Sequence, residues 1–283
     1  MIDPDNLNIF IDNALKEDIG SGDHTSIACI PSMDEGKAQL IIKEKGILAG
    51  VEVARQVFRR FDPFLKTTVF KNDGTEIFPD DMVLEVEGRI LSILQCERLA
   101  LNIMQHMSGI ATQTNQYVEK LAGTSTKLLD TRKTTPGMRL LDKEAVRIGG
   151  GGNHRTGLFD MILIKDNHID FAGGIEKAID AVNSYLEKRG KMLKIEIEAR
   201  TLEDVERIVK HSKIHRIMFD NFDVETTRKA VEIVGGYHET ESSGNIHLNN
   251  IREYALCGVD YISVGALTHH IKSLDMSLKS VGG

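Results

Sequence analysis

Short apolar runs that alternate with helical patterns fill the second half of this chain, and they constrain its fold more than any other feature. The runs lie at Lys127–Leu129, Met161–Ile164, Ile195–Ile197, Ile217–Phe219, Tyr237–Glu239 and Tyr261–Val264. Strands that alternate with helices are typical of a parallel sheet with right-handed crossovers. Because these units are fewer than those of a complete (β/α)8 barrel, the pattern predicts an α/β fold with an incomplete, TIM-like parallel barrel of about six strands.

The first part of the chain has a less regular pattern. It predicts a helix from Pro4 to Gly20, a strand pair within residues 36–49, a helix near residues 50–61, and strands at residues 65–71 and 82–87. Strands and helices that mix without regular alternation indicate an α+β domain.

A further helical pattern lies between Ile93 and Leu121, and Ser108-Gly109 is expected to interrupt it. We place the domain boundary there. This gives an N-terminal α+β domain at residues 1–108 and a barrel at residues 109–269, with the tail at residues 270–283 expected to pack back on the first domain. His106 is favoured as a packing residue over a cofactor ligand, because the methionines around it are typical core fillers.

Composition excludes several classes of function. The 283 residues are 41% hydrophobic and carry a formal net charge of −7, which argues against nucleic acid as a partner. No apolar run is long enough to cross a membrane, and the start MIDPDNLNIF lacks the features of a signal peptide, so a cytoplasmic location is expected. Cys29, Cys96 and Cys257 are odd in number and far apart, which predicts reduced, structural thiols.

A cluster of basic residues lies between Leu128 and Ile169, around the glycine run Gly149–Gly152. Its members are Arg132, Lys133, Arg139, Lys143, Arg147, Arg155 and Lys165, with His154 and His168. A solvated basic face is the simpler interpretation of such a cluster. Several of these residues follow predicted strands, however, and this favours a site for an anion of several charges. The glycine run is expected to form a loop with unusual dihedral angles that approaches the ligand, although a flexible linker is the alternative.

Polar residues follow directly after each predicted strand. They are Asp130-Thr131-Arg132-Lys133, Lys165-Asp166, Glu198, Asp220-Asn221, Ser243-Gly244 and Gly265. Because the carboxyl ends of barrel strands carry the active site, we expect these groups to meet at one mouth.

Two kinds of chemistry are expected at this mouth. Basic side chains would bind a polyanion, and Ser243-Gly244 and Gly265, each ahead of a predicted helix, would suit phosphate. Glu198 and Asp220 would suit ribose hydroxyls, a magnesium-bound phosphate or a developing carbocation, or they could simply pair with lysines. Asp18, Asp23 and His24 are favoured as turn and helix caps over metal ligands.

The chain resembles the quinolinate phosphoribosyltransferase family in motifs that span residues 17 to 269. These include EDIGSGDHTS, ERLALNIMQHMSGIAT, LDTRKTTPGMR, GGGGNHRTGLFDMILIKDNH, IEIEA, FDNF, ESSGNI and ISVGALTH. The resemblance implies a two-domain subunit and a homodimer as the minimum unit. It also implies Mg²⁺-dependent transfer of phosphoribosyl from phosphoribosyl pyrophosphate to quinolinate, giving nicotinate mononucleotide, pyrophosphate and CO₂ in NAD biosynthesis.

The resemblance also assigns residues. It places quinolinate on Arg132, His154, Arg155 and Lys165, with Arg98 from the partner subunit. It places phosphoribosyl pyrophosphate on Lys133, Glu198, Asp220, Ser243, Gly244, Gly265 and His269. Catalytic roles are expected for Lys133, Lys165, Glu198 and Asp220, and the substrate pyrophosphate would carry Mg²⁺ with Glu198 and Asp220 as candidate ligands. Asn245 stands where the family frequently has glycine, which leaves the shape of that loop open.

Three alternatives share these features. A related phosphoribosyltransferase would act on another acceptor, although the NHR and IKDNH segments favour the dicarboxylate. A Schiff-base aldolase would use Lys165 at the end of its strand. A sensor without catalysis would bind phosphoribosyl pyrophosphate and not turn it over.

Overall fold

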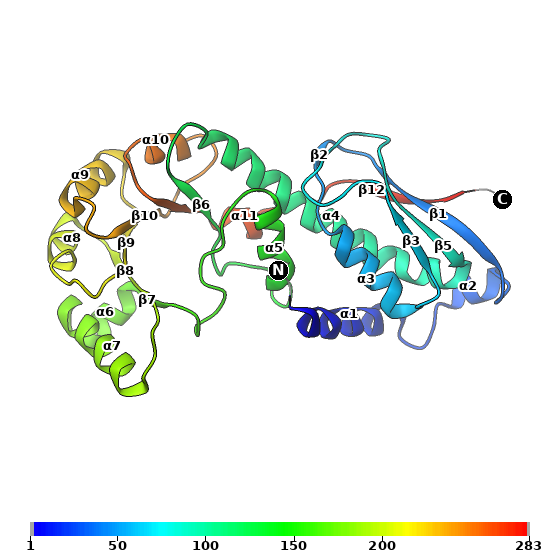
Figure 1. Ribbon diagram of the computed structural model, residues 1–283, viewed down its shortest axis with the longest axis horizontal. Helices are drawn as coiled ribbons and strands as arrows, with labels where there is room; N and C mark the ends of the chain where they lie inside the picture. Colours follow the sequence, from blue (N-terminus) through cyan, green and yellow to red (C-terminus); the bar gives the residue numbers. More distant parts are fainter. Residues whose placement is uncertain (1–2, 282–283) are drawn as a thin grey trace. The chain divides into compact units, whose positions relative to one another are not determined.

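The protein is described here as a computed structural model covering residues 3–281, and it divides into two units (Figure 1). Unit 1 comprises the described residues of 1–115, 134–150 and 267–283, and unit 2 comprises residues 116–133 and 151–266. The boundary drawn from the sequence at residue 108 differs from this division, because residues 109–115 and the segment 134–150 group with unit 1.

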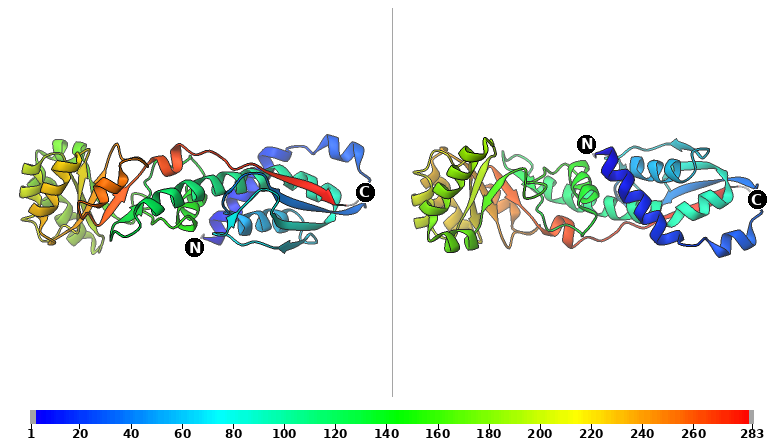
Figure 2. Two further views of the ribbon diagram at one scale, coloured as in Figure 1. Left: turned by 90° about the horizontal axis from the view of Figure 1, so that it is seen from above. Right: turned by 90° about the horizontal axis from the view of Figure 1, so that it is seen from below.

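Unit 1 contains an antiparallel sheet whose strands come from both ends of the chain. In order across the sheet these are β12 (Met276–Val281), β1 (Glu35–Ile42), β5 (Met82–Arg89) and β3 (Lys66–Val69). β12 lies along β1 from Ile42↔Met276 to Lys37↔Val281 (Figure 2). The predicted strand pair within residues 36–49 is wrong in its pairing, because β2 (Gly46–Ile47) joins β4 (Glu76–Ile77) in a separate two-stranded sheet.

The helices of unit 1 largely follow the predicted pattern. They are α1 (Pro4–Ile19), α2 (His24–Cys29), α3 (Val51–Phe61), α4 (Ile90–Lys120), whose last residues belong to unit 2, and α5 (Arg139–Ile148). Asp3 caps α1 through the N–H of Asn6, and Gly20 ends it in a conformation with positive φ. The core includes Leu40, Ile42, Phe58, Leu84, Ile103, Met104 and Met107, all nearly inaccessible to solvent.

The predicted break at Ser108-Gly109 is wrong, since α4 continues through both residues. Gly109 is needed for packing, because a Cβ atom there would collide with the carbonyl oxygen of Lys272. Ser108 Oγ accepts a hydrogen bond from the N–H of Ala49 and donates one to the carbonyl oxygen of the same residue. Both residues therefore let a continuous α4 pack closely against neighbouring backbone, Gly109 against Lys272 and Ser108 against Ala49.

Unit 2 contains the predicted six-stranded parallel sheet. Its strands are β6 (Lys127–Leu129), β7 (Ile162–Ile164), β8 (Ile195–Ala199), β9 (Arg216–Asp220), β10 (Glu239–Ser243) and β11 (Tyr261–Ser263). The run predicted at Tyr237–Glu239 was placed too early, because Tyr237 is exposed and belongs to the turn after α9. The order β6-β11-β10-β9-β8-β7 follows a ring that lacks direct pairing between β6 and β7, so the barrel is incomplete as predicted.

Residues 153–161 span the gap in this ring. Gly152 forms a single parallel bridge with Leu129 on the free edge of β6, donating its N–H to the carbonyl oxygen of Leu128. The chain then reaches β7, which is the other edge strand. The segment that carries His154 and Arg155 therefore crosses from one edge of the sheet to the other without ladder hydrogen bonds of its own.

Helices cover the outer face of the unit 2 sheet (Figure 1). They are α6 (Asp166–Ala172), α7 (Ile175–Arg189), α8 (Leu202–Ile208), α9 (Val224–Val234) and α10 (Ile251–Ala255), and α11 (Ala266–His269) follows β11. Among the described residues, no helix is both long and apolar enough to cross a membrane.

Candidate active site

A pocket of about 480 Å³ opens at the carboxyl ends of the unit 2 strands, as predicted from the residues that follow them. It is lined by Thr131, Arg132, Lys133, His154, Arg155, Leu163, Lys165, Glu198, Met218, Asp220, Asn221, Ser243, Gly244, Asn245 and Ser263. Three predicted site residues lie outside this lining. Arg98 is exposed on α4 and His269 is exposed at the end of α11, both in unit 1, while Gly265 sits between β11 and α11.

One part of the pocket is strongly cationic. Burial and then the neighbouring charge of Arg132 lower the pKa of the Arg155 guanidinium from its ordinary value. Arg155 Nη1 donates to the carbonyl oxygen of Met161 at 3.3 Å. The Nε of Arg132 is buried and has no hydrogen-bond partner within residues 3–281. Two guanidinium groups that repel each other, one with an unused buried donor, are suited to an anionic ligand.

A pair of carboxylates occupies another part. Glu198 is buried, and its Oε1 lies 2.6 Å from Lys165 Nζ while its Oε2 accepts the N–H of Asp166 at 3.1 Å. Glu198 thus pairs with a lysine, which was the simpler of the roles expected for it. Burial, and then the charge of Glu198, raise the pKa of the Asp220 carboxyl. Two neighbouring carboxyl groups of this kind attract a cation or a hydroxyl donor.

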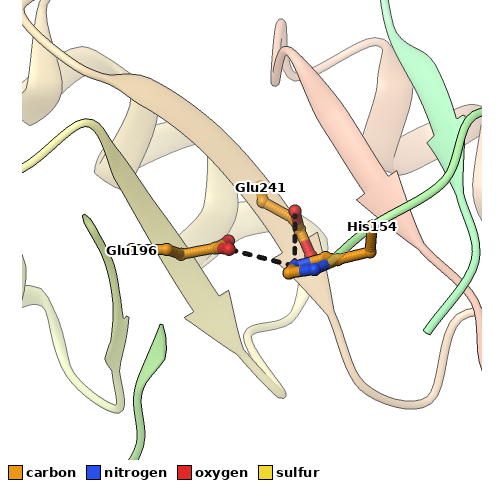
Figure 3. A group of neighbouring side chains, drawn as sticks. All are labelled: His154, Glu196 and Glu241. Carbon is orange, nitrogen blue, oxygen red and sulfur yellow. Dashed lines mark ion pairs between the residues drawn. The ribbon is translucent and has the colours of Figure 1, made fainter. Parts of the chain in front are cut away.

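His154 is the centre of a buried polar cluster (Figure 3). Its Nε2 lies 2.9 Å from Glu196 Oε2 and 3.7 Å from Glu241 Oε2, and all three residues are buried. Its Nδ1 accepts the N–H of Arg155 at 2.7 Å, and its own N–H donates to Asp130 Oδ1 at 2.8 Å. The three side chains have the spacing of metal ligands. Because Nδ1 accepts a hydrogen bond, however, the proton of the neutral ring is on Nε2, and this tautomer cannot bind a metal there.

Arg216 extends this cluster within the barrel. Its Nη1 lies 2.7 Å from Glu241 Oε2, its Nη2 lies 3.2 Å from Glu239 Oε2, and its guanidinium stacks on the Tyr261 ring at 3.8 Å. Burial is the main cause that raises the pKa of Glu196 and of Glu241 to about 7.

Sequence reasoning missed Glu196, Arg216 and Glu241, although a signal was present. Side chains two residues apart on a strand point to the same face, so Glu196 and Glu198 share a face of β8. Charged residues at such spacing in a strand that is buried throughout indicate a polar barrel interior.

The turn after β10 brings two loops together. Asn221, Gly244 and Asn245 all have positive φ, at 58°, 91° and 54°, and a Cβ at Gly244 would collide with the Asn221 side chain. Asn245 Nδ2 donates to Asn221 Oδ1 at 3.1 Å. The left-handed conformation of Asn245 explains why glycine suits this position. A helix follows each of the two predicted phosphate segments, but α10 begins only at Ile251, well after Ser243-Gly244, whereas α11 begins directly after Gly265.

The glycine run serves the protein itself. Gly150 has a φ of 93°, but Gly149 ends α5 with ordinary dihedral angles and lies against the carbonyl oxygen of Ala111 in α4. A Cβ at Gly152 would come within 3.0 Å of Leu129. The expected close approach is therefore to neighbouring protein atoms, and none of the four glycines lines the pocket among the described residues.

The remaining candidates have structural roles. His106 Nε2 lies 2.6 Å from the buried Asp142 carboxylate, and Asp23 caps α2 through the N–H of Ser26. Cys96 and Cys257 are free and buried, whereas Cys29 is free but exposed, so the expectation of a structural thiol fits only the first two.

Comparison with known proteins gives a consistent result over the whole chain. The family described as the quinolinate phosphoribosyl transferase C-terminal domain matches residues 110–279, and its N-terminal domain matches residues 23–108. The mitochondrial decarboxylating quinolinate phosphoribosyltransferase 2 of Nicotiana glauca is 44% identical over 281 residues, which cover 94% of this chain and 80% of the relative. The probable carboxylating nicotinate-nucleotide pyrophosphorylase of Bacillus subtilis is 39% identical over 273 residues, covering 96% and 92%.

Solved structures agree with these sequence relatives. The crystal structure of NadC from Streptococcus pyogenes matches with a TM-score of 0.93 at 38% identity and covers 100% of this chain and 99% of that chain. The nicotinate-nucleotide pyrophosphorylase of Pyrococcus furiosus, at 18% identity and a TM-score of 0.69, shares the fold.

Proposed function

The chain belongs to the quinolinate phosphoribosyltransferase family, and on that premise we propose how its unit 2 pocket performs the reaction. The enzyme transfers phosphoribosyl from phosphoribosyl pyrophosphate to quinolinate with decarboxylation, a step of NAD biosynthesis. One observation carries the proposal: a single pocket combines the cationic pair Arg132 and Arg155 with the carboxylates Glu198 and Asp220. A dicarboxylate and a phosphorylated sugar need these two environments side by side.

The cationic part would bind quinolinate. Arg132, Arg155 and Lys165 offer donors for two carboxylates, and a dianion would offset both the burial and the neighbouring charge of Arg132 that lower the pKa of Arg155. To bind the substrate, Lys165 must replace part of its ion pair with Glu198 by an ion pair with a quinolinate carboxylate. Binding of quinolinate would thereby free Glu198 for the sugar.

The carboxylate part would hold phosphoribosyl pyrophosphate. As pyrophosphate leaves, positive charge develops on the anomeric carbon, and Glu198 or Asp220 would stabilise it. Lys133, exposed at the pocket wall, would neutralise the leaving group, and the turn of Ser243 and Gly244 would contact phosphate through its backbone.

Mg²⁺ fits this donor set. Asp220 carries a raised pKa beside Glu198, and hard cations take carboxylate oxygens as ligands. Glu198 and Asp220 would hold the ion together with the substrate pyrophosphate, and the ion would supply charge neutralisation for the leaving group. No metal is needed for decarboxylation, because the ribosylated ring nitrogen is cationic and accepts the electrons left when CO₂ departs.

We further propose a homodimer whose partner subunit supplies Arg98, with Gly265 and His269 assigned to phosphoribosyl pyrophosphate. These roles rest on the family resemblance and on the exposure of Arg98 and His269. A cytoplasmic location also stays a prediction, since the names of plant relatives place those proteins in mitochondria or chloroplasts.

The test is a product assay with purified protein, Mg²⁺, phosphoribosyl pyrophosphate and quinolinate. Equal amounts of CO₂ and nicotinate mononucleotide are expected. Calorimetry separates the two subsites: Asp220→Ala should keep its affinity for quinolinate measured alone and lose affinity for phosphoribosyl pyrophosphate. The reverse pattern would overturn the assignment, and binding of phosphoribosyl pyrophosphate without turnover would indicate a sensor.

The Schiff-base alternative has less support. An aldolase needs the lysine as a neutral amine, whereas Lys165 Nζ lies 2.6 Å from the Glu198 carboxylate in an ion pair. Borohydride treatment with carbonyl substrates should therefore leave Lys165 unlabelled.

A further inference from the structure

The resemblance assigns His154 to the substrate, yet the polar groups of this residue face the protein. Its N–H donates to Asp130 Oδ1, its Nδ1 accepts the N–H of Arg155, and its Nε2 faces Glu196 Oε2 at 2.9 Å. The imidazole is only 6% exposed. A substrate carboxylate would have to displace one of these contacts to reach either ring nitrogen.

The neighbours of His154 show what these contacts accomplish. Arg155 belongs to the segment that spans the barrel gap, where no strand ladder fixes the backbone. Glu196 lies on β8, which is paired on one side with β7 and on the other with β9, and it is buried. The series from Glu196 through His154 to the Arg155 N–H therefore ties the gap-spanning backbone to a rigid strand.

Glu196 is itself held by the same interior. Arg216 lies on β9, which adjoins β8, and Glu241 lies on β10, the next strand. Arg216 Nη1 is 4.0 Å from Glu196 Oε1 and 2.7 Å from Glu241 Oε2. The side chain that contacts His154 therefore lies within a buried cluster of charged groups.

We propose that Glu196 and His154 are positioning residues that aim the Arg155 guanidinium at the substrate, and that Arg155 makes the contact assigned to His154. The inference rests on the proposed function, since quinolinate is the ligand that Arg155 is aimed at. A positioning role of this kind lowers the cost of ordering the binding group before the ligand arrives.

The sign of one measurement separates positioning from simple electrostatics. Glu196→Ala removes an acidic group near an anion site, so a field effect alone would tighten quinolinate binding. Loss of the anchor should instead weaken it about tenfold or more, because Arg155 is no longer held in place. Glu196→Gln keeps a polar side chain of nearly the same shape against His154 and should bind quinolinate within about threefold of wild type. Titration calorimetry at pH 8 gives these dissociation constants without turnover.

Kinetics and a control variant complete the test. Glu196→Ala should raise the KM for quinolinate with little change in the KM for phosphoribosyl pyrophosphate. Glu239→Ala is the matched control. Glu239 lies on the same strand as Glu241 and also contacts Arg216, but the buried group around His154 is formed by Glu196 and Glu241, so this variant should leave quinolinate affinity unchanged. Equal weakening by both variants would overturn the proposal in favour of a general loss of barrel stability.

His154 variants keep the proposal testable if Glu196→Ala does not fold. His154→Asn retains a short side-chain acceptor for the Arg155 N–H, whereas His154→Ala does not. Affinity for quinolinate should be better retained in the Asn variant. Equal losses would mean that the imidazole itself binds the substrate. If the wild-type protein binds no quinolinate, the proposed function fails; if it binds and Glu196→Ala binds equally well, only this inference fails.

Discussion

Among single residues, Arg132 and Arg155 decide most about specificity. They place two guanidinium groups at one pocket, where burial and mutual repulsion lower the pKa of Arg155. Each group gains most from a ligand that brings its own negative charge, so the number of carboxylates on the acceptor should matter more than its ring.

Nicotinate tests this point, because it lacks one of the two carboxylates of quinolinate. We expect kcat/KM for nicotinate to be lower by about 10³-fold or more, since a half-buried guanidinium group would be left without its counter-charge. Steady-state assays with both acceptors at fixed phosphoribosyl pyrophosphate measure the ratio. Comparable values would contradict the assignment of the cationic pair to a dicarboxylate.

The buried carboxyl of Glu241 should make the free energy of unfolding depend on pH. Burial raises its pKa from the ordinary 4.5 to about 7, so between these values the folded protein holds a proton that the unfolded chain has lost. The free energy of unfolding should therefore fall as pH rises from 5 to 7.5, by on the order of 1–3 kcal/mol. Urea unfolding at several pH values measures it. Glu241→Gln, which can still accept from Arg216, should show a smaller decrease, and an unchanged decrease would assign the effect to other groups.

At the scale of elements, α4 illustrates how packing overrides a local signal. Glycine normally weakens a helix, yet Gly109 lies inside an unbroken one because the backbone at Lys272 approaches it too closely for any side chain. The same reasoning applies at Gly149, where α5 ends against the carbonyl oxygen of Ala111.

Gly109→Ala should destabilise unit 1 even though alanine has the higher helix propensity. A clash with a backbone oxygen forces α4 and the C-terminal segment apart, at a cost of about 1–3 kcal/mol. Asn102→Ala on the exposed face of α4 is the control and should be neutral or slightly stabilising. Thermal unfolding of both variants gives the comparison; a higher Tm for Gly109→Ala would mean that the segment near Lys272 yields easily.

These elements also show what the sequence could predict. The barrel strands were predicted because buried parallel strands are short apolar runs, and the pocket followed from the residues after them. The roles of Gly109, Glu196 and Glu241 depend on which segments meet across the fold, and no local pattern determines such contacts. Strand β10 was misplaced for a related reason: its residues Glu239, Glu241 and Ser243 are polar, because they line a charged interior instead of an apolar core.

For the whole molecule, the proposed sharing of sites between subunits concerns Arg98 and His269. Arg98 is exposed on α4, and His269 is exposed beyond β11. Neither lines the unit 2 pocket among the described residues.

Mixed dimers answer this question. Arg98→Ala and Lys165→Ala should each be nearly inactive alone, but a mixed dimer would contain one site with both residues intact if Arg98 acts across the interface. With random mixing about half of the dimers are mixed, so refolding the two variants together should restore roughly a quarter of wild-type activity. No recovery, with mixed dimers verified by mass spectrometry, would place Arg98 in its own chain or outside the site.

The pairing of β12 with β1 has a consequence for synthesis in the cell. β12 begins more than 230 residues after β1 ends, so at typical elongation rates the ribosome adds the last strand about 10 to 50 seconds after the first. During that interval the outer edge of β1 is an unpaired strand edge, open to pairing with other nascent chains. Chaperone dependence and aggregation of this protein should therefore depend on how long the edge of β1 stays unpaired before β12 is synthesised.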